Sequence, residues 1–174
     1  MKILITGPVG SGKTTQAKIL AQKFNLCFIS GGDLARSKAA EKSSEGRRIK
    51  QAMKNGRLID DKIEAQLVKA SIAGKCLGGF VLDGYPRSLN QLNFFNPGFE
   101  KVFLLDISDQ EAEKRLILRG RGDDKPEVIK ERLGIYHRLT QPVIEYYTKL
   151  GKVVKINGTK NIQDIAKEIE QNTP

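Results

Sequence analysis

Apolar residues follow two patterns along this chain, short runs and helical repeats. The short apolar runs predict buried strands at Lys2–Thr6, Cys27–Ser30, Gly79–Asp83, Lys101–Asp106 and Lys152–Ile156. Between them, helices are predicted at Gly12–Phe24, Asp33–Ala40, Glu45–Asn55, Asp60–Ala73, Ser88–Phe95, Ser108–Leu118, Lys125–Leu150 and Ile162–Ile169, with Pro142 kinking the longest. Buried strands alternating with helices indicate an α/β fold: a five-stranded parallel sheet with helices on both faces, in one domain over residues 1–174.

Two segments are too polar to match this core. They are Ser30–Leu58 and Arg119–Lys125, the second reading Arg-Gly-Arg-Gly-Asp-Asp-Lys. Ligands of parallel α/β sheets bind at the carboxyl ends of the strands. We therefore expect both segments to be mobile flaps over a site at that edge.

Composition excludes several classes of protein. The 174 residues are 39% hydrophobic and 29% charged, which is ordinary for a globular domain. A membrane-spanning helix needs about 20 apolar residues, and the longest apolar runs, such as Val102 to Leu105, are much shorter. The first six residues are too short for a signal peptide, so a cytoplasmic enzyme without membrane attachment is expected.

The cysteines, the histidine and the net charge limit the metal sites and ligands that this chain is expected to have. Cys27 and Cys76 lie beside apolar residues and are interpreted as two small buried hydrophobic side chains in a reducing compartment. His137 is the only histidine, so no zinc site is expected. The net charge of +10 suits nucleic acid or a small polyanion such as a nucleotide, and the positions of the arginines must decide between them.

One motif indicates a nucleoside triphosphate. Residues Gly7 to Thr14 match G-x-x-x-x-G-K-[ST], after a predicted strand and at the start of a predicted helix. In this loop the backbone N–H groups surround phosphates and the lysine reaches the β and γ phosphates. The candidate ATP residues are Gly10, Ser11, Gly12, Lys13, Thr14 and Thr15, and Thr14 or Thr15 would supply a hydroxyl to Mg²⁺.

A second anion site follows the third strand. Asp83 ends that strand and would hold Mg²⁺ or its water, with Thr15 as the other metal residue. Gly84, Tyr85, Pro86 and Arg87 come next, and the tight turn would bring the Arg87 guanidinium to the same sheet edge.

These motifs together resemble the adenylate kinase family of nucleoside monophosphate kinases, over nearly the whole chain. The matching segments are Gly7 to Gln16, Ile29 to Arg36, Gly79 to Arg87, Arg121 to Asp124, Lys130 to Leu133 and Asn157 to Lys160. The resemblance implies reversible, Mg²⁺-dependent phosphoryl transfer from ATP to AMP, which gives two ADP. It also implies a monophosphate-binding region at 30–58 and a lid at 119–125, which is very short because only Gly120 separates Arg119 from Arg121.

The resemblance implies a role for each matching residue. Lys13, Arg87, Arg119, Arg121 and Arg132 would act on the transferred phosphoryl group, and Arg119 and Lys160 would contact the ATP adenine. The acceptor nucleotide would contact Gly31, Arg36, Arg57, Leu58, Ile59, Gly84, Tyr85, Pro86, Arg87, Gln91, Arg121 and Arg132.

Two residues bear on the identity of the acceptor base. Gln91 is the residue of adenylate kinases, whereas Gly31 stands where they usually have Thr. As acceptors we expect AMP to be used best, pyrimidine monophosphates second and GMP poorly. A UMP/CMP kinase or a broad-specificity kinase is the alternative.

Other protein classes fit the sequence less well. A shikimate kinase would need Asp-x-Asp where Gly32 to Arg36 stands. A nucleic-acid-binding P-loop protein is disfavoured because no aromatic platform is evident. Without a large apolar stripe, a monomer is expected.

Overall fold

The computed structural model describes residues 1–120 and 124–173, and it contains the predicted sheet. Strands β1 (Lys2–Thr6), β2 (Cys27–Ser30), β3 (Phe80–Asp83), β4 (Lys101–Asp106) and β5 (Val153–Asn157) pair in the order β2-β3-β1-β4-β5, and every pair is parallel. All the strands therefore end at one edge of the sheet. The α/β prediction is confirmed.

The helices lie close to their predicted positions. They are α1 (Lys13–Lys23), α2 (Gly31–Ala39), α3 (Ser44–Lys54), α4 (Asp61–Ile72), α5 (Leu89–Phe94), α6 (Asp109–Arg119), α7 (Pro126–Ile135), α8 (Gln141–Lys149) and α9 (Ile162–Gln171). Side-chain caps explain several starts: Ser30 Oγ accepts from the Asp33 N–H at 3.2 Å, and Ser88 Oγ accepts from the Gln91 N–H at 3.2 Å.

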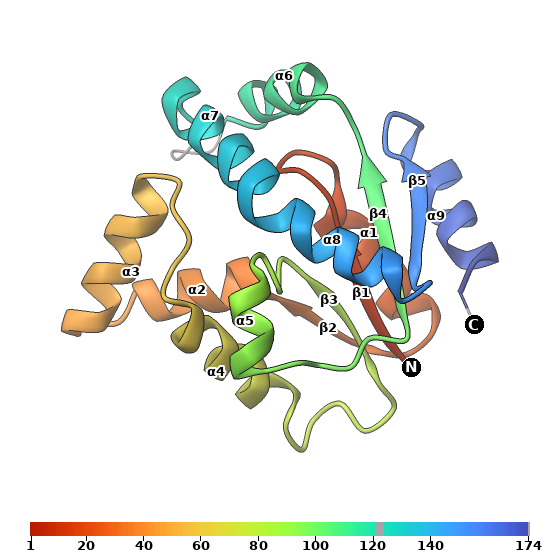
Figure 1. The fold of residues 1–174 in the computed structure, drawn as a ribbon, viewed down its shortest axis with the longest axis horizontal. Helices are drawn as coiled ribbons and strands as arrows, with labels where there is room; N and C mark the ends of the chain where they lie inside the picture. The colour runs from red at the N-terminus through yellow and green to blue at the C-terminus, as the bar shows by residue number, and fades with distance from the viewer. Residues whose placement is uncertain (121–123, 174) are drawn as a thin grey trace.

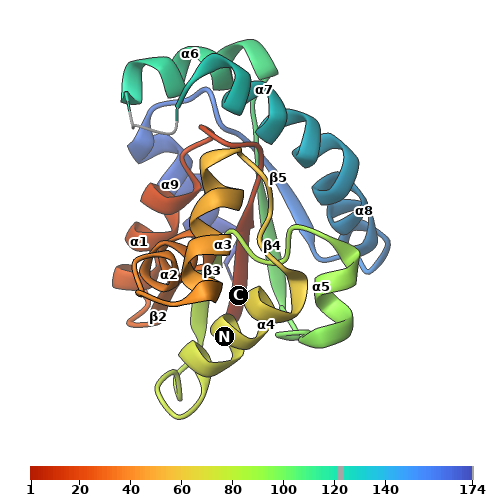
Figure 2. The ribbon, with the colours of Figure 1, turned by 90° about the vertical axis from the view of Figure 1, so that its left-hand side faces the viewer.

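Alternating residues of each strand bury opposite faces of the sheet. On β1, Ile3 and Ile5 pack in a cluster with α1 and α9, whereas Leu4 packs in a second cluster with α4 and α8. Figures 1 and 2 show the resulting three layers, with α1 and α9 on one side of the sheet and α8 crossing the other. None of the helices in the described part of the chain is long and apolar enough to cross a membrane.

The predicted long helix at Lys125–Leu150 is continuous, but its irregular turn precedes the proline. A π-helical turn, η1 (Tyr136–Thr140), joins α7 to α8. Pro142 has no N–H group to donate to the carbonyl of Arg138, which lies four residues earlier and inside this turn. The irregular turn therefore lies where the sequence predicted that Pro142 would disturb the long helix.

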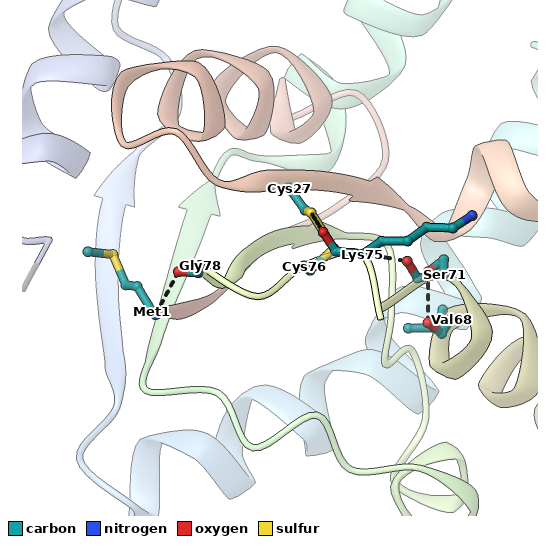
Figure 3. Close-up of a disulfide and its surroundings, with 7 residues drawn as sticks. All are labelled: Met1, Cys27, Val68, Ser71, Lys75, Cys76 and Gly78. Atoms are coloured by element: carbon teal, nitrogen blue, oxygen red, sulfur yellow. Dashed lines mark hydrogen bonds between the residues drawn. A yellow bond between two sulfur atoms is a disulfide. The ribbon is translucent and has the colours of Figure 1, made fainter. Parts of the chain in front are cut away.

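The interpretation of the cysteines as separate buried thiols is wrong. Cys27 of β2 and Cys76 of the loop after α4 form a disulfide, with their Cα atoms 5.5 Å apart (Figure 3), and both residues are partly exposed. The chain brings them together because the Cys27 N–H donates to the Gly79 carbonyl where β3 begins. The disulfide joins residues 49 positions apart, so the spacing of the cysteines alone did not indicate it.

Two helical pairs flank the edge at which the strands end. Helices α2 and α3 stand beyond the β2 side of the sheet, and α6 and α7 lie across the end of the sheet (Figure 1). Helices α2 and α3 lie within the polar segment Ser30–Leu58. The second polar segment, Arg119–Lys125, joins α6 to α7, and its residues 121–123 lie outside the described residues.

Candidate active site

A cavity of about 340 Å³ opens at the carboxyl ends of the strands. Its walls come from the loop after β1, the start of α2, the segment before α4, the turn after β3, and helices α6 and α7. The cavity therefore touches the phosphate loop, the segments of the predicted acceptor site and the turn that ends at Arg87. The lining residues predicted from the sequence are Gly10, Gly12, Lys13, Thr14, Thr15, Arg36, Arg57, Leu58, Ile59, Asp83, Gly84, Tyr85, Pro86, Arg87, Arg119 and Arg132.

The loop Gly7–Thr14 needs its glycines for close packing. Gly7 has φ of +142°, and a Cβ on it would collide with the Leu105 carbonyl oxygen. Gly10 has φ of +85°, and a Cβ there would lie 3.0 Å from the Ala112 carbonyl oxygen on α6. Because both positions are left-handed and tight, the loop can wrap closely at the start of α1.

Lys13 lies at the base of this loop and its ammonium donates to the Pro8 carbonyl oxygen at 2.7 Å. Burial lowers the pKa of Lys13 to about 8, with smaller contributions from the cations Arg87 and Arg119 and with Asp83 acting in the opposite direction. The cluster is therefore short of negative charge, which an anionic ligand would supply.

Asp83 and Thr14 meet between the first and third strands. Thr14 Oγ1 donates to Asp83 Oδ2 at 2.5 Å, and Asp83 is buried at the carboxyl end of β3. Thr14, rather than Thr15, is thus the hydroxyl beside the carboxylate. The described residues contain no group of three or more His, Cys, Asp or Glu side chains that could hold a metal ion.

Three arginines approach the cavity from different elements. Arg87 Nε donates to the Gly84 carbonyl oxygen at 2.8 Å, which folds its side chain back over the turn after β3. Arg119 of α6 and Arg132 of α7 both contact Asp124, at 2.7 Å and 3.4 Å, and the Asp124 side chain is only 1% exposed. This buried carboxylate holds the two guanidiniums side by side at the cavity wall.

Several predicted site residues lie elsewhere. Gly31 and Ser11 are buried behind the wall, and the Ser11 hydroxyl has no hydrogen-bond partner among the described residues. The Lys160 ammonium pairs with Glu168 at 2.8 Å, outside the cavity. Arg121 lies outside the described residues.

Gln91 also lies behind the wall rather than on it. The side chain is fully buried, and both ends of its amide are used. Its Oε1 accepts from the Arg87 N–H at 2.7 Å, and its Nε2 donates to Glu64 Oε2 at 2.9 Å. The residue expected to contact the acceptor base therefore contacts a carboxylate instead.

Among the described residues, two charged side chains that line the cavity were missed by the sequence reasoning. Glu64 of α4 lines the cavity although it is only 3% exposed. Arg115 of α6 also lines it, and Arg115 Nη1 donates to the Gly158 carbonyl oxygen at 3.0 Å, in the turn after β5. Arg115 could have been found because it lies four residues before Arg119 on one helix face. Glu64 could not have been found in this way, because the sequence pattern places it on the polar surface of a helix.

Comparisons with known proteins agree with this geometry. The family model of adenylate kinase matches residues 5–152. The chain belongs to the adenylate kinase family. An adenylate kinase of Petrotoga mobilis is 34% identical over 97% of this chain and 95% of its own. Adenylate kinases of Prochlorococcus marinus (strain MIT 9515) and Synechococcus sp. (strain RCC307) are 38% and 35% identical, each over 97% of this chain and 96% of their own.

Membership of the adenylate kinase family confirms the resemblance stated from the motifs. It also confirms the interpretation of the chain as a nucleoside monophosphate kinase. The roles of individual residues are a separate question, and they rest on the cavity.

Proposed function

We propose that this adenylate kinase transfers a phosphoryl group from ATP to AMP and gives two ADP. The observation that carries the proposal is one cavity with a phosphate loop at one end, the acceptor segments at the other, and Arg87, Arg119 and Arg132 between them. Planar guanidiniums match phosphate oxygens, and two polyanionic nucleotides need this much positive charge.

In this arrangement ATP lies along the phosphate loop. Lys13 and the loop N–H groups hold its phosphates. The ATP adenine packs near Arg115, which is hydrogen-bonded to the turn containing Gly158. Arg119 is therefore assigned to the phosphates rather than to the adenine.

AMP lies at the α2–α3 end of the cavity. Arg36 and Arg87 bind its phosphate, and Arg57, Leu58 and Ile59 line the space for its nucleoside. An oxygen of the AMP phosphate forms a bond to the γ-phosphorus as the bond from that phosphorus to the β–γ bridging oxygen breaks. The attacking oxygen is already ionised, so no general base is needed.

The side chains of Thr14 and Asp83, which meet at the carboxyl end of β3, fit magnesium. Thr14 and Asp83 offer hard oxygen donors, and Mg²⁺ in nucleotide sites takes few protein ligands beside phosphates and water. When bound with ATP, the ion neutralises charge on the phosphates. Thr14 would supply the hydroxyl ligand, and Asp83 would hold the ion through water.

The test is a coupled assay of ADP formation with Mg-ATP and each acceptor nucleotide. We expect AMP to give the highest kcat/KM, with activity lost when Mg²⁺ is chelated. Formation of ADP without an acceptor, or a preference for CMP or UMP over AMP, would contradict the proposal. We also propose a cytoplasmic monomer. Because a reducing cytoplasm keeps most such pairs as thiols, the Cys27–Cys76 disulfide would form there only under oxidising conditions.

A further inference from the structure

Glu64 is a buried carboxylate that phosphoryl transfer does not use. It lies on α4, is 3% exposed, and lines the acceptor end of the cavity with Leu58 and Ile59. A buried carboxylate is costly, and a buried Glu is rarely retained without a partner. Here burial raises the pKa of Glu64, while Arg87 and the hydrogen bond from Gln91 oppose that rise.

Among the described residues, hydrogen bonds reach only one oxygen of this carboxylate. Glu64 Oε2 accepts from Gln91 Nε2 at 2.9 Å, and no hydrogen bond from the described residues reaches Oε1. The Gln91 amide is fixed in its turn by the Arg87 N–H. Gln91 thus acts as a positioning residue that holds the carboxylate and leaves Oε1 as its free acceptor.

Gly31 shows where this free oxygen lies. A Cβ on Gly31 would be 3.2 Å from Glu64 Oε1 and 3.0 Å from the Gly84 carbonyl oxygen. Two acceptor oxygens from α4 and the turn after β3 therefore converge on one region beside Gly31. The lack of a side chain at Gly31 is what leaves room for the carboxylate.

We infer that Glu64 determines base specificity by accepting a hydrogen bond from an exocyclic amino group of the acceptor nucleotide. The inference rests on the proposed function and concerns its acceptor subsite. The Glu64 carboxylate would select bases that carry an amino group, which adenine has at position 6 and cytosine at position 4. A keto oxygen at the same place would meet a second acceptor with no proton between them.

Guanine is disfavoured by the same geometry. A carboxylate with both oxygens free could pair with the two adjacent donors of guanine, but Gln91 already occupies Oε2. The single remaining oxygen suits a single amino group. The expected order is therefore AMP over IMP and CMP over UMP, with GMP poor.

The experiment compares kcat/KM for AMP and IMP, which differ by amino against keto at position 6. In the unaltered protein we expect AMP to exceed IMP by roughly 100-fold, because a buried polar group is left unpaired. In Glu64→Gln, the amide oxygen would accept from Gln91 and the amide N–H₂ would face the base. We therefore expect the AMP:IMP ratio to fall at least tenfold, with an absolute gain for IMP.

A matched control is Asp61→Asn, which removes a carboxylate one turn earlier on α4. Asp61 accepts from Ser88 and Asn90 and does not line the cavity. It should leave the AMP:IMP ratio unchanged. A merely structural role for Glu64 would lower both activities in Glu64→Gln without any gain for IMP.

A second measurement needs no variant. Purine riboside 5′-monophosphate carries hydrogen in place of the amino group, and we expect it to lose at least tenfold against AMP in the unaltered protein. A loss under threefold, or an unchanged AMP:IMP ratio in Glu64→Gln, would overturn the inference. Failure of the unaltered protein to phosphorylate AMP at all would overturn the proposed function instead.

Discussion

At the scale of single residues, Arg87 is the side chain whose loss should affect chemistry most and folding least. It lines the cavity, and its Nε donates a hydrogen bond to the neighbouring Gly84 carbonyl oxygen. We expect Arg87→Ala to lower kcat/KM by about 10²–10³, as losing one pre-organised donor to transition-state charge does. The thermal midpoint should move by a few degrees at most.

The control for this prediction is Lys160→Ala. Lys160 is also a cation of the predicted site, but its ammonium pairs with Glu168 outside the cavity. The kcat/KM of Lys160→Ala should stay within a factor of about two of the unaltered protein, because an exposed ion pair contributes little. Equal losses in the two variants would show that general charge, and not position, matters.

Glu64 should also make stability depend on pH. Burial raises its pKa in the folded protein, with Asp61 adding to the rise and Arg87 and Gln91 opposing it; Tyr85 is the other titratable group close by. A carboxyl whose folded pKa is raised favours folding when protonated, and that contribution is lost as pH rises through the folded pKa. Glu64→Gln, which cannot ionise, should therefore gain stability over the unaltered protein between pH 5 and pH 8.

The measurement is the urea midpoint of both proteins at the two pH values, with Asp61→Asn for comparison. A difference between Glu64→Gln and the unaltered protein that is the same at pH 5 and pH 8 would argue against ionisation of Glu64 in the fold.

At the scale of elements, the disulfide ties β2 to the loop after α4. It closes a loop that contains α2, α3 and α4, over a separation of 49 residues (Figure 3). Restricting that loop in the unfolded chain should stabilise the fold by about 2–4 kcal/mol. Reduction should therefore lower the urea midpoint of the unaltered protein, and Cys76→Ser should show the same lower midpoint with or without reductant. A midpoint indifferent to reductant in both proteins would contradict this.

At the scale of the whole molecule, two nucleotides must be enclosed so that ATP is not hydrolysed by water. Helices α2 and α3 stand beyond the β2 edge (Figure 1), and their buried residues Ala35 and Ile49 pack in a small cluster separate from the two clusters that cover the sheet. We expect a bisubstrate analogue to slow amide hydrogen exchange in α2 and α3 far more than in the central strand β4. Equal protection with and without the analogue would count against closure of this region.

The sequence by itself determined the fold and the phosphate chemistry of this adenylate kinase. Short apolar runs and helical repeats are local patterns, and caps such as Ser88 act within three residues. The strands and helices could therefore be located from the sequence alone. The phosphate loop and the segment ending at Arg87 are also contiguous, and their backbone geometry follows from glycine and proline at fixed positions.

Only the tertiary structure decided which side chains meet. Cys27 and Cys76 are far apart in the chain, and the Glu64–Gln91 hydrogen bond joins two helices across 27 positions. Whether Gln91 faces a ligand or a buried carboxylate depends on how α4 packs against α5, which no local pattern reports. Long-range packing thus placed Glu64, and not Gln91, at the wall where the acceptor base is proposed to bind.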